Sequence, residues 1–267
     1  MTFTQKILSA QAKANSSLCI GLDTDIRKLP EILKNEPNPM AAFNKAIIEA
    51  TSDLACAYKP NTAYYEAGGT KGLDALSATL DAIPSHILTI GDCKRGDMST
   101  TNEQYHIAWQ ELFRFDSITV SPYMGRESYE PFLQSEEQGV FFLGLTSNPG
   151  ASDFQYLELA SGKKLYEQVT DTVAEWNKAK KNCGLVVGAT KPEELRALRE
   201  RAPELPFLVP GVGAQGGSLE ESLKANGNGI ALINVSRGVT AASSGNDFAE
   251  AARAAALKFV EAMRALS

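Results

Sequence analysis

The chain has 267 residues, of which 43% are hydrophobic and 22% are charged. This is the profile of a soluble globular protein that can bury a sizeable core. The formal net charge of −6 argues against a nucleic-acid-binding surface and against attraction to anionic membranes. The sequence has no run near the ~18 apolar residues of a membrane helix, and its first residues lack the apolar core of a signal peptide.

The cysteines and histidines are few and scattered. The four cysteines show no CxxC spacing, which is typical of reduced thiols in a cytoplasmic protein. The two histidines, His86 and His106, are far apart and have no ligand-like spacing. The sequence therefore predicts a cytoplasmic protein without a histidine-built metal site.

Short apolar segments alternate with longer amphipathic stretches along the chain. Eight segments are strand-like, at residues 18–23, 54–61, 87–92, 117–122, 140–145, 184–189, 206–211 and 230–236. Amphipathic stretches such as 39–52 and 101–113 separate them, as expected for a parallel sheet covered by helices. Eight such units favour a (β/α)₈ TIM barrel, and the GxGxxG fingerprint of a doubly wound sheet is missing after the first strand.

The barrel prediction also bears on domain organisation. Barrels of this length are often one domain, so we expect residues 1–267 to form a single domain. An N-terminal helix should precede the first strand. Long loops, at about 24–39 and 146–164, should follow the first and fifth strands.

Polar residues follow many of the predicted strands. In a TIM barrel the C-terminal strand ends carry the chemistry, so polar residues there are functional candidates. These residues are Asp23, Lys59, Asn61, Asp92, Lys94, Ser147, Gln215 and Arg237.

The segment DCKRGD, residues 92–97, ends the third predicted strand. Because strand side chains alternate between faces, Asp92 and Lys94 should point with Ile90 toward the barrel axis. Arg95 lies on the opposite face, where a structural role is expected. Taken alone, the segment could also be a simple ion pair at the rim of the barrel.

A helix is expected to begin shortly after this segment. Thr100 and Glu103 match the S/T-x-x-E capping box, which places the helix start near Thr101. Asp97 should therefore lie in the connecting loop. A purely structural role is then open for Asp97, in which its carboxylate only interacts favourably with the positive end of the helix dipole.

The glycine-rich segments GVGAQGG and SRG follow the seventh and eighth strands. Barrels often bind phosphate at these positions, and Gln215 and Arg237 supply an amide and a guanidinium. The backbone N–H groups of Gly216 and Gly217 could contribute at the start of the next helix. Alternatively, these glycines could be ordinary turn residues.

Six motifs occur in order along nearly the whole chain. They are GLD, YKPNTAYYE, DCKRGD, LTSNPGA, VPGVGAQGG and NVSRG, and DCKRGD has the DxKxxD pattern of a decarboxylase superfamily. With these motifs the chain resembles the orotidine 5′-phosphate decarboxylase family, in its longer bacterial-type branch. The resemblance implies decarboxylation of orotidine 5′-phosphate to uridine 5′-phosphate and CO₂ in de novo pyrimidine biosynthesis.

The resemblance also implies roles for the charged residues. Asp23 and Lys59 would bind ribose hydroxyls, and Asp92 and Lys94 would meet the reacting carboxylate. Asp97 would enter from the neighbouring subunit of a homodimer. The charges of Lys59, Asp92, Lys94 and Asp97 would then alternate in sign around the reaction centre.

Two further contacts follow from the same resemblance. Ser147 would hydrogen-bond the pyrimidine edge from a mobile loop, although a serine in such a loop is usually a turn former. Thr101 would contact the ribose of the partner subunit's substrate. Tyr64, Tyr65 and Trp109 are expected to be packing residues.

The implied reaction needs an acid at carbon six of the pyrimidine, because the electrons left there are poorly delocalised. Lys94 could stabilise the developing carbanion and deliver the proton. Asp92 would lie near the substrate carboxylate, and two like charges ~4 Å apart repel by about 4 kcal/mol at an effective dielectric constant near 20. We nevertheless expect preorganised electrostatic stabilisation to contribute more to the rate than this repulsion does.

Two other functions are open at this stage. A magnesium-dependent decarboxylase or aldolase of the same superfamily would carry an acidic metal ligand at the end of strand two, where this sequence has Lys59. A non-catalytic nucleotide-binding barrel would not need the full set Lys59, Asp92, Lys94 and Asp97. We therefore expect no metal and no organic cofactor.

Overall fold

The computed structural model describes residues 1–213 and 216–266. Its centre is a closed barrel of eight parallel strands in chain order, in which β1 pairs with both β2 and β8. The strands are β1 (Leu18–Leu22), β2 (Ala57–Pro60), β3 (Leu88–Arg95), β4 (Ser117–Val120), β5 (Gly139–Leu145), β6 (Cys183–Val187), β7 (Phe207–Pro210) and β8 (Ala231–Val235). The predicted (β/α)₈ barrel is confirmed.

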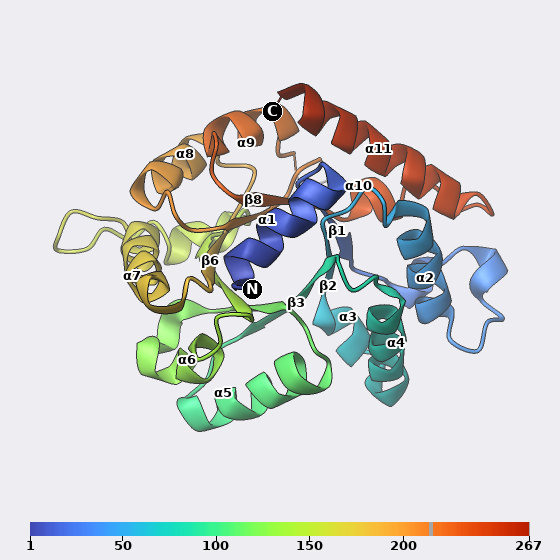
Figure 1. The fold of residues 1–267 in the computed structure, drawn as a ribbon, viewed down its shortest axis with the longest axis horizontal. Coiled ribbons are helices and arrows are strands. Elements are labelled where there is room, and N and C mark those ends of the chain that lie inside the picture. The colour runs from blue at the N-terminus through green and yellow to red at the C-terminus, as the bar shows by residue number, and fades with distance from the viewer. Residues whose placement is uncertain (214–215, 267) are drawn as a thin grey trace.

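Helices before, between and after the strands cover the barrel (Figure 1). They are α1 (Phe3–Ala14), α2 (Pro39–Thr51), α3 (Thr62–Glu66), α4 (Gly69–Ala82), α5 (Ser99–His106), α6 (Arg126–Leu133), α7 (Leu165–Lys180), α8 (Pro192–Arg201), α9 (Leu219–Asn226), α10 (Arg237–Thr240) and α11 (Phe248–Leu266). A π-helical segment, Ile107–Leu112, continues α5. Within the described ranges, none of the helices is long and apolar enough to cross a membrane.

Helix α1 lies across the N-terminal end of the barrel (Figure 1). Its buried residues Phe3 and Ile7 join the cluster of side chains that fills the barrel interior. The Phe3 ring packs edge-on against Phe141, with ring centroids 5.7 Å apart. At Gly139, a Cβ atom would lie 2.2 Å from the Phe3 ring, so the close approach requires glycine there. One end of the barrel is therefore closed by packed side chains.

The two predicted long loops contain short helical turns. The loop after β1 holds the 3-10 helices Ile26–Lys28 and Glu31–Leu33, and the loop after β5 holds Pro149–Asp153. The loop after β5 folds back on its own start. The Gln155 side chain accepts the Thr146 N–H and donates to the Thr146 hydroxyl, both at 2.8 Å.

The predicted capping box at Thr100 and Glu103 is wrong. Helix α5 begins at Ser99, and its N-cap residue Met98 makes no side-chain capping hydrogen bond. The early start has a physical cause, because the Asn102 side-chain amide donates to Asp97 O at 2.8 Å and to the remote Ser128 O at 2.6 Å, and so fixes the turn before the helix. Asp97 lies in the connecting loop, as predicted.

Candidate active site

A cavity of about 320 Å³ opens at the C-terminal ends of the strands. Most of the candidate residues that follow the predicted strands line it, although they come from distant parts of the sequence. These are Asp23, Lys59, Asn61, Asp92, Lys94, Ser147 and Arg237. Residues not singled out from the sequence also line it, among them Thr119, Thr146, Asn148, Asn234 and Ser236. Gln215 lies outside the described residues.

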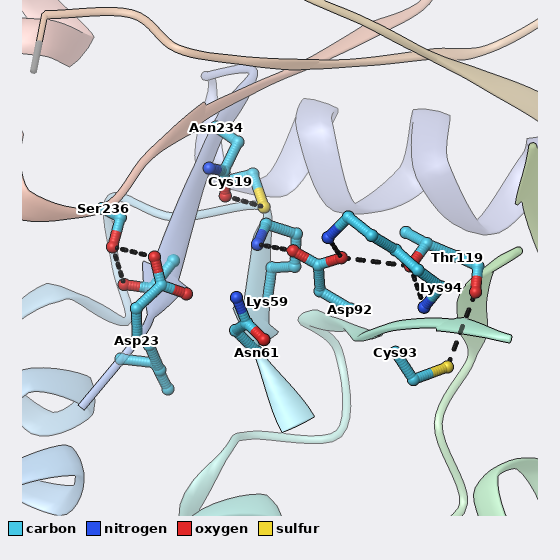
Figure 2. Close-up of polar contacts among 12 residues, drawn as sticks. Cys19, Asp23, Lys59, Asn61, Asp92, Cys93, Lys94, Thr119, Asn234 and Ser236 are labelled. Carbon is cyan, nitrogen blue, oxygen red and sulfur yellow. Dashed lines mark hydrogen bonds and ion pairs between the residues drawn. The ribbon is translucent and has the colours of Figure 1, made fainter. Parts of the chain in front are cut away.

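Asp92 is the centre of a charged group at this end of the barrel (Figure 2). Its Oδ2 atom lies 2.6 Å from Lys59 Nζ, and its Oδ1 atom lies 2.5 Å from Lys94 Nζ. Lys59 is 3% exposed, whereas half of the Lys94 side chain is exposed to the cavity and solvent. Both lysines line the cavity, and of the two ammonium groups that of Lys94 is the more exposed.

Burial and charge act in opposite directions on the buried pair. Burial alone would raise the pKa of Asp92, but the charges and hydrogen bonds of Lys59 and Lys94 hold that pKa well below its usual value. Burial alone would lower the pKa of Lys59, but the charges of Asp92 and Asp23 raise it above its usual value. Both Lys59 and Asp92 are therefore charged at neutral pH.

The backbone of β3 is irregular at these residues. The register between β3 and β4 shifts between Gly91 and Arg95, which pair with Ile118 and Val120, so Asp92, Cys93 and Lys94 form a bulge. Lys94 has φ +45°. A non-glycine residue in this left-handed region costs about 1–3 kcal/mol. Bulges of this kind redirect side chains next to active sites.

Asp23 and Ser236 lie on the side of Lys59 that faces away from Asp92 and Lys94 (Figure 2). The Ser236 hydroxyl donates to Asp23 Oδ2 at 2.7 Å. The other oxygen, Oδ1, is buried and has no hydrogen-bond partner among the described residues. A buried carboxylate oxygen in this state is an acceptor suited to a ligand hydroxyl.

Ser147 and Arg237 line another part of the cavity, at the ends of β5 and β8. The neighbouring glycines are less accessible to a ligand than the sequence suggested. The Gly216 N–H donates to Gly213 O at 2.8 Å, and the Gly217 N–H donates to Gly211 O at 3.1 Å. A phosphate could bind these amides only by displacing the carbonyl oxygens.

Asp97 and Thr101 do not line the cavity of their own chain, as far as the described residues define it. Asp97 accepts a hydrogen bond from the Met98 N–H at 2.8 Å, in the loop between β3 and α5. The four groups Lys59, Asp92, Lys94 and Asp97 are thus only partly brought together within one chain.

Arg95 points away from the cavity, as expected for a structural residue. Its guanidinium pairs with Glu66 at 2.5 Å and lies over the rings of Tyr105 and Trp109, 5.0 and 5.2 Å from their centroids. These contacts join the end of β3 to α3 and α5. The polar sequence DCKRGD therefore faces the cavity on one side and neighbouring helices on the other.

The strand-four residue Thr119 was missed from the sequence. Its hydroxyl contacts both Asp92 and Lys94. The signal that could have identified it is a hydroxyl residue at an inward position near the end of an otherwise apolar strand. Ser236 was also missed, although it belongs to the motif NVSRG, because a serine next to an arginine in a glycine-containing turn carries no signal of its own.

Comparisons with known proteins agree with this arrangement. Residues 16–255 match the family described as orotidine 5′-phosphate decarboxylase / HUMPS. The chain is 50% identical to orotidine 5′-phosphate decarboxylase of Herpetosiphon aurantiacus over 99% of both chains, and 45% identical to that of Thermomicrobium roseum over 96% and 92%. The solved structure of Leishmania donovani OMP decarboxylase superposes with a TM-score of 0.86 at 38% identity, covering 100% of this chain and 99% of the other. The chain therefore belongs to the orotidine 5′-phosphate decarboxylase / HUMPS family and is an enzyme of the carboxy-lyase type.

Proposed function

We propose that this enzyme converts orotidine 5′-phosphate to uridine 5′-phosphate and CO₂ in de novo pyrimidine biosynthesis, without a metal or an organic cofactor. In this reaction the bond between carbon six and the carboxylate breaks, and its electrons remain on carbon six. Lys94 stabilises these electrons and delivers a proton to the same carbon. The observation that carries the proposal is the Lys59–Asp92–Lys94 array, in which one ammonium is buried and the other faces the cavity.

The array has the electrostatics that this step requires. Both carboxylate oxygens of Asp92 receive an ammonium group, so the Asp92 charge is fixed in place before the substrate binds. A preorganised charge of this kind needs no rearrangement during the reaction. Lys94 remains accessible, so its ammonium can reach the carbon that loses CO₂.

The remaining cavity residues are assigned by their chemistry. Asp23 Oδ1, which has no hydrogen-bond partner in the described part of the chain, and the ammonium of Lys59 suit ribose hydroxyls. Ser147 suits the polar edge of the pyrimidine. Arg237, with the amide of Gln215, suits the phosphate because a guanidinium binds a phosphate dianion in a bidentate manner.

The absence of a metal requirement rests on Lys59. A magnesium-dependent relative would need an acidic ligand at the end of β2, where this chain has an ammonium 2.6 Å from Asp92. That cation would repel Mg²⁺ from the carboxylate. The residue at the end of β2, Lys59, therefore argues against the magnesium-dependent alternative.

We further propose a homodimer in which Asp97 and Thr101 complete the partner's site. This proposal is supported by their position outside the cavity of their own chain and by the half-exposed Lys94, whose ammonium has room for a second carboxylate. A cytoplasmic location is supported by the four cysteines, which are all free.

A direct assay separates the three candidate functions. The purified protein is incubated with orotidine 5′-phosphate after exhaustive chelation, and the loss of pyrimidine absorbance is followed. We expect full activity in the chelated enzyme. Activity restored only by Mg²⁺ would support the metal-dependent alternative, and nucleotide binding without turnover would support a non-catalytic barrel.

A further inference from the structure

Thr119 on β4 contacts every residue of the bulge in β3 (Figure 2). Its hydroxyl accepts a hydrogen bond from the Lys94 N–H at 3.0 Å and donates one to Asp92 Oδ1 at 3.0 Å. Its carbonyl oxygen accepts a hydrogen bond from the Cys93 thiol at 3.5 Å. Thr119 is itself 1% exposed, the contact to Cys93 is buried, and the hydrogen bonds to Lys94 and Asp92 are partly buried.

The bulge explains why a side chain is needed at this position. The β3–β4 register is broken between Gly91 and Arg95, and the side-chain oxygen of Thr119 accepts the Lys94 N–H where a ladder carbonyl would otherwise do so. A buried N–H group that loses its acceptor is costly. The left-handed backbone of Lys94 also persists only where its surroundings hold it. The Thr119 hydroxyl meets both requirements.

The direction of the hydroxyl proton follows from its partners. Thr119 Oγ1 accepts from the Lys94 backbone, and its single proton is therefore free to point toward the carboxylate. Asp92 Oδ1 is an acceptor only, and it receives both this proton and the Lys94 ammonium. One hydroxyl thus holds the backbone of Lys94 and the carboxylate with which the Lys94 side chain pairs.

We propose that Thr119 is a positioning residue, whose hydroxyl aims the Lys94 ammonium at the reacting carbon by holding the β3 bulge in shape. The proposal rests on the proposed function, since it assumes that Lys94 is the proton donor. Thr119 acts through Lys94 and Asp92 and needs no contact with the reacting atoms.

Two substitutions at Thr119 separate the hydroxyl from the side-chain shape. Thr119→Val keeps the shape and removes the hydroxyl, and it should lower kcat by about 10- to 100-fold, the cost of a reacting group displaced by ~1 Å. Because substrate binding depends little on the orientation of the Lys94 ammonium, KM should change by less than roughly threefold. Thr119→Ser keeps the hydroxyl and should restore kcat to within roughly threefold of the wild type.

A matched control lies on the same strand. Ser117 is fully buried, and its hydroxyl has no hydrogen-bond partner among the described residues. Ser117→Ala removes a buried hydroxyl without removing a contact to the bulge, and we expect wild-type kcat and KM. A loss of kcat in this variant equal to that in Thr119→Val would show a general effect of altering β4 and would overturn the proposal.

A second readout is independent of turnover. Hydrogen exchange of the Lys94 amide, followed by NMR in protein labelled with ¹⁵N-lysine, should be slow in the wild type and Thr119→Ser and fast in Thr119→Val. An unchanged kcat or an unchanged exchange rate in Thr119→Val would overturn the proposal, as would a Thr119→Ser variant as impaired as Thr119→Val.

The two readouts also keep this proposal distinct from the proposed function. A wild-type enzyme that does not convert orotidine 5′-phosphate would refute the proposed function, and with it the role of Thr119 in that reaction. The amide exchange would still decide whether Thr119 holds the bulge. If Thr119→Val does not fold, Thr119→Ala with the same Ser comparison provides the test.

Discussion

Lys94 combines a strained backbone with an accessible ammonium group. Its φ of +45° places the side chain beside Asp92, and half of the side chain remains exposed. A residue held in an unfavourable conformation is consistent with selection for its chemistry over its contribution to stability. Substitution of Lys94 should therefore affect turnover far more than folding.

The first prediction concerns the different effects of a Lys94 substitution on turnover and on folding. Lys94→Ala should lower kcat by several orders of magnitude, since the other ammonium that the described residues place at Asp92, that of Lys59, is buried. The folded variant should still bind uridine 5′-phosphate, which can be measured by calorimetry. Substantial residual decarboxylation would mean that another group supplies the proton.

The second prediction concerns the pH dependence of the buried pair. The pKa of Asp92 is lowered in the fold, so its stabilisation is present above the usual carboxyl pKa and is lost as the pH falls through the lowered value. The pKa of Lys59 is raised, so its stabilisation is present below the usual lysine pKa and is lost as the pH rises through the raised value. The contribution of the pair should be constant between about pH 4 and pH 10.

Lys59→Met should therefore destabilise the protein by about 3–5 kcal/mol at neutral pH, because it leaves a buried carboxylate without its closest buried partner. The free energy of unfolding is measured in urea across the pH range, and the difference from the wild type should narrow below about pH 4. Lys45 pairs with Glu49 at the surface at 3.8 Å, so Lys45→Met is the control and should cost less than about 1 kcal/mol. Similar losses in both variants would contradict the prediction.

The strand-end residues were predictable from the sequence because the fold assigns them a common edge. Once eight strands are recognised, Asp23, Lys59, Asp92, Lys94 and Arg237 must gather at the same end of the barrel. The sequence carried no sign of the bulge, since no glycine marks the left-handed position in β3. Thr119 was missed for the same reason, because its contacts exist only where the register breaks.

At the scale of elements, the strands were easier to predict than the helix ends. Each strand contains or adjoins an apolar run. The start of α5, in contrast, is decided by hydrogen bonds of Asn102 to Asp97 O and Ser128 O, and Ser128 is remote in sequence. The capping motif at Thr100 was overridden by these contacts. Local sequence patterns compete with tertiary hydrogen bonds, and here the latter prevailed.

The third prediction concerns helix α1. Phe3 is 1% exposed and packs into the barrel interior, so Phe3→Ala should destabilise the protein by about 3–5 kcal/mol. Leu8 on the same helix is 47% exposed, and Leu8→Ala should cost less than about 1 kcal/mol. Both variants should retain kcat, because α1 closes the end of the barrel opposite the cavity. Chemical denaturation and the decarboxylation assay check these expectations, and equal stability of the two variants would contradict them.

At the scale of the whole molecule, the proposed dimer makes the fourth prediction. Lys94→Ala and Asp97→Ala homodimers should each be nearly inactive. Mixing them after reversible dissociation should restore activity, because one site of each heterodimer collects both defects and the other is intact. Random pairing makes half of the dimers mixed, so roughly a quarter of the sites should work.

The same experiment contains its own control. If Lys94 and Asp97 served one site within a single chain, every site in every dimer would carry a defect and no activity would return. Heterodimer formation is checked by mass spectrometry of differently tagged chains. Inactive mixtures with proven heterodimers would exclude the shared site.

The burial of the thiols has a practical consequence for observing this enzyme in motion. All four cysteines are buried, and burial raises the pKa of Cys19, Cys93 and Cys183 to about 12. Thiolates, which react with maleimide dyes, are therefore scarce in the native fold at neutral pH. Phe154, in the loop after β5, is 68% exposed. A fluorophore attached to a cysteine introduced there would report on that loop alone, with every native cysteine left in place.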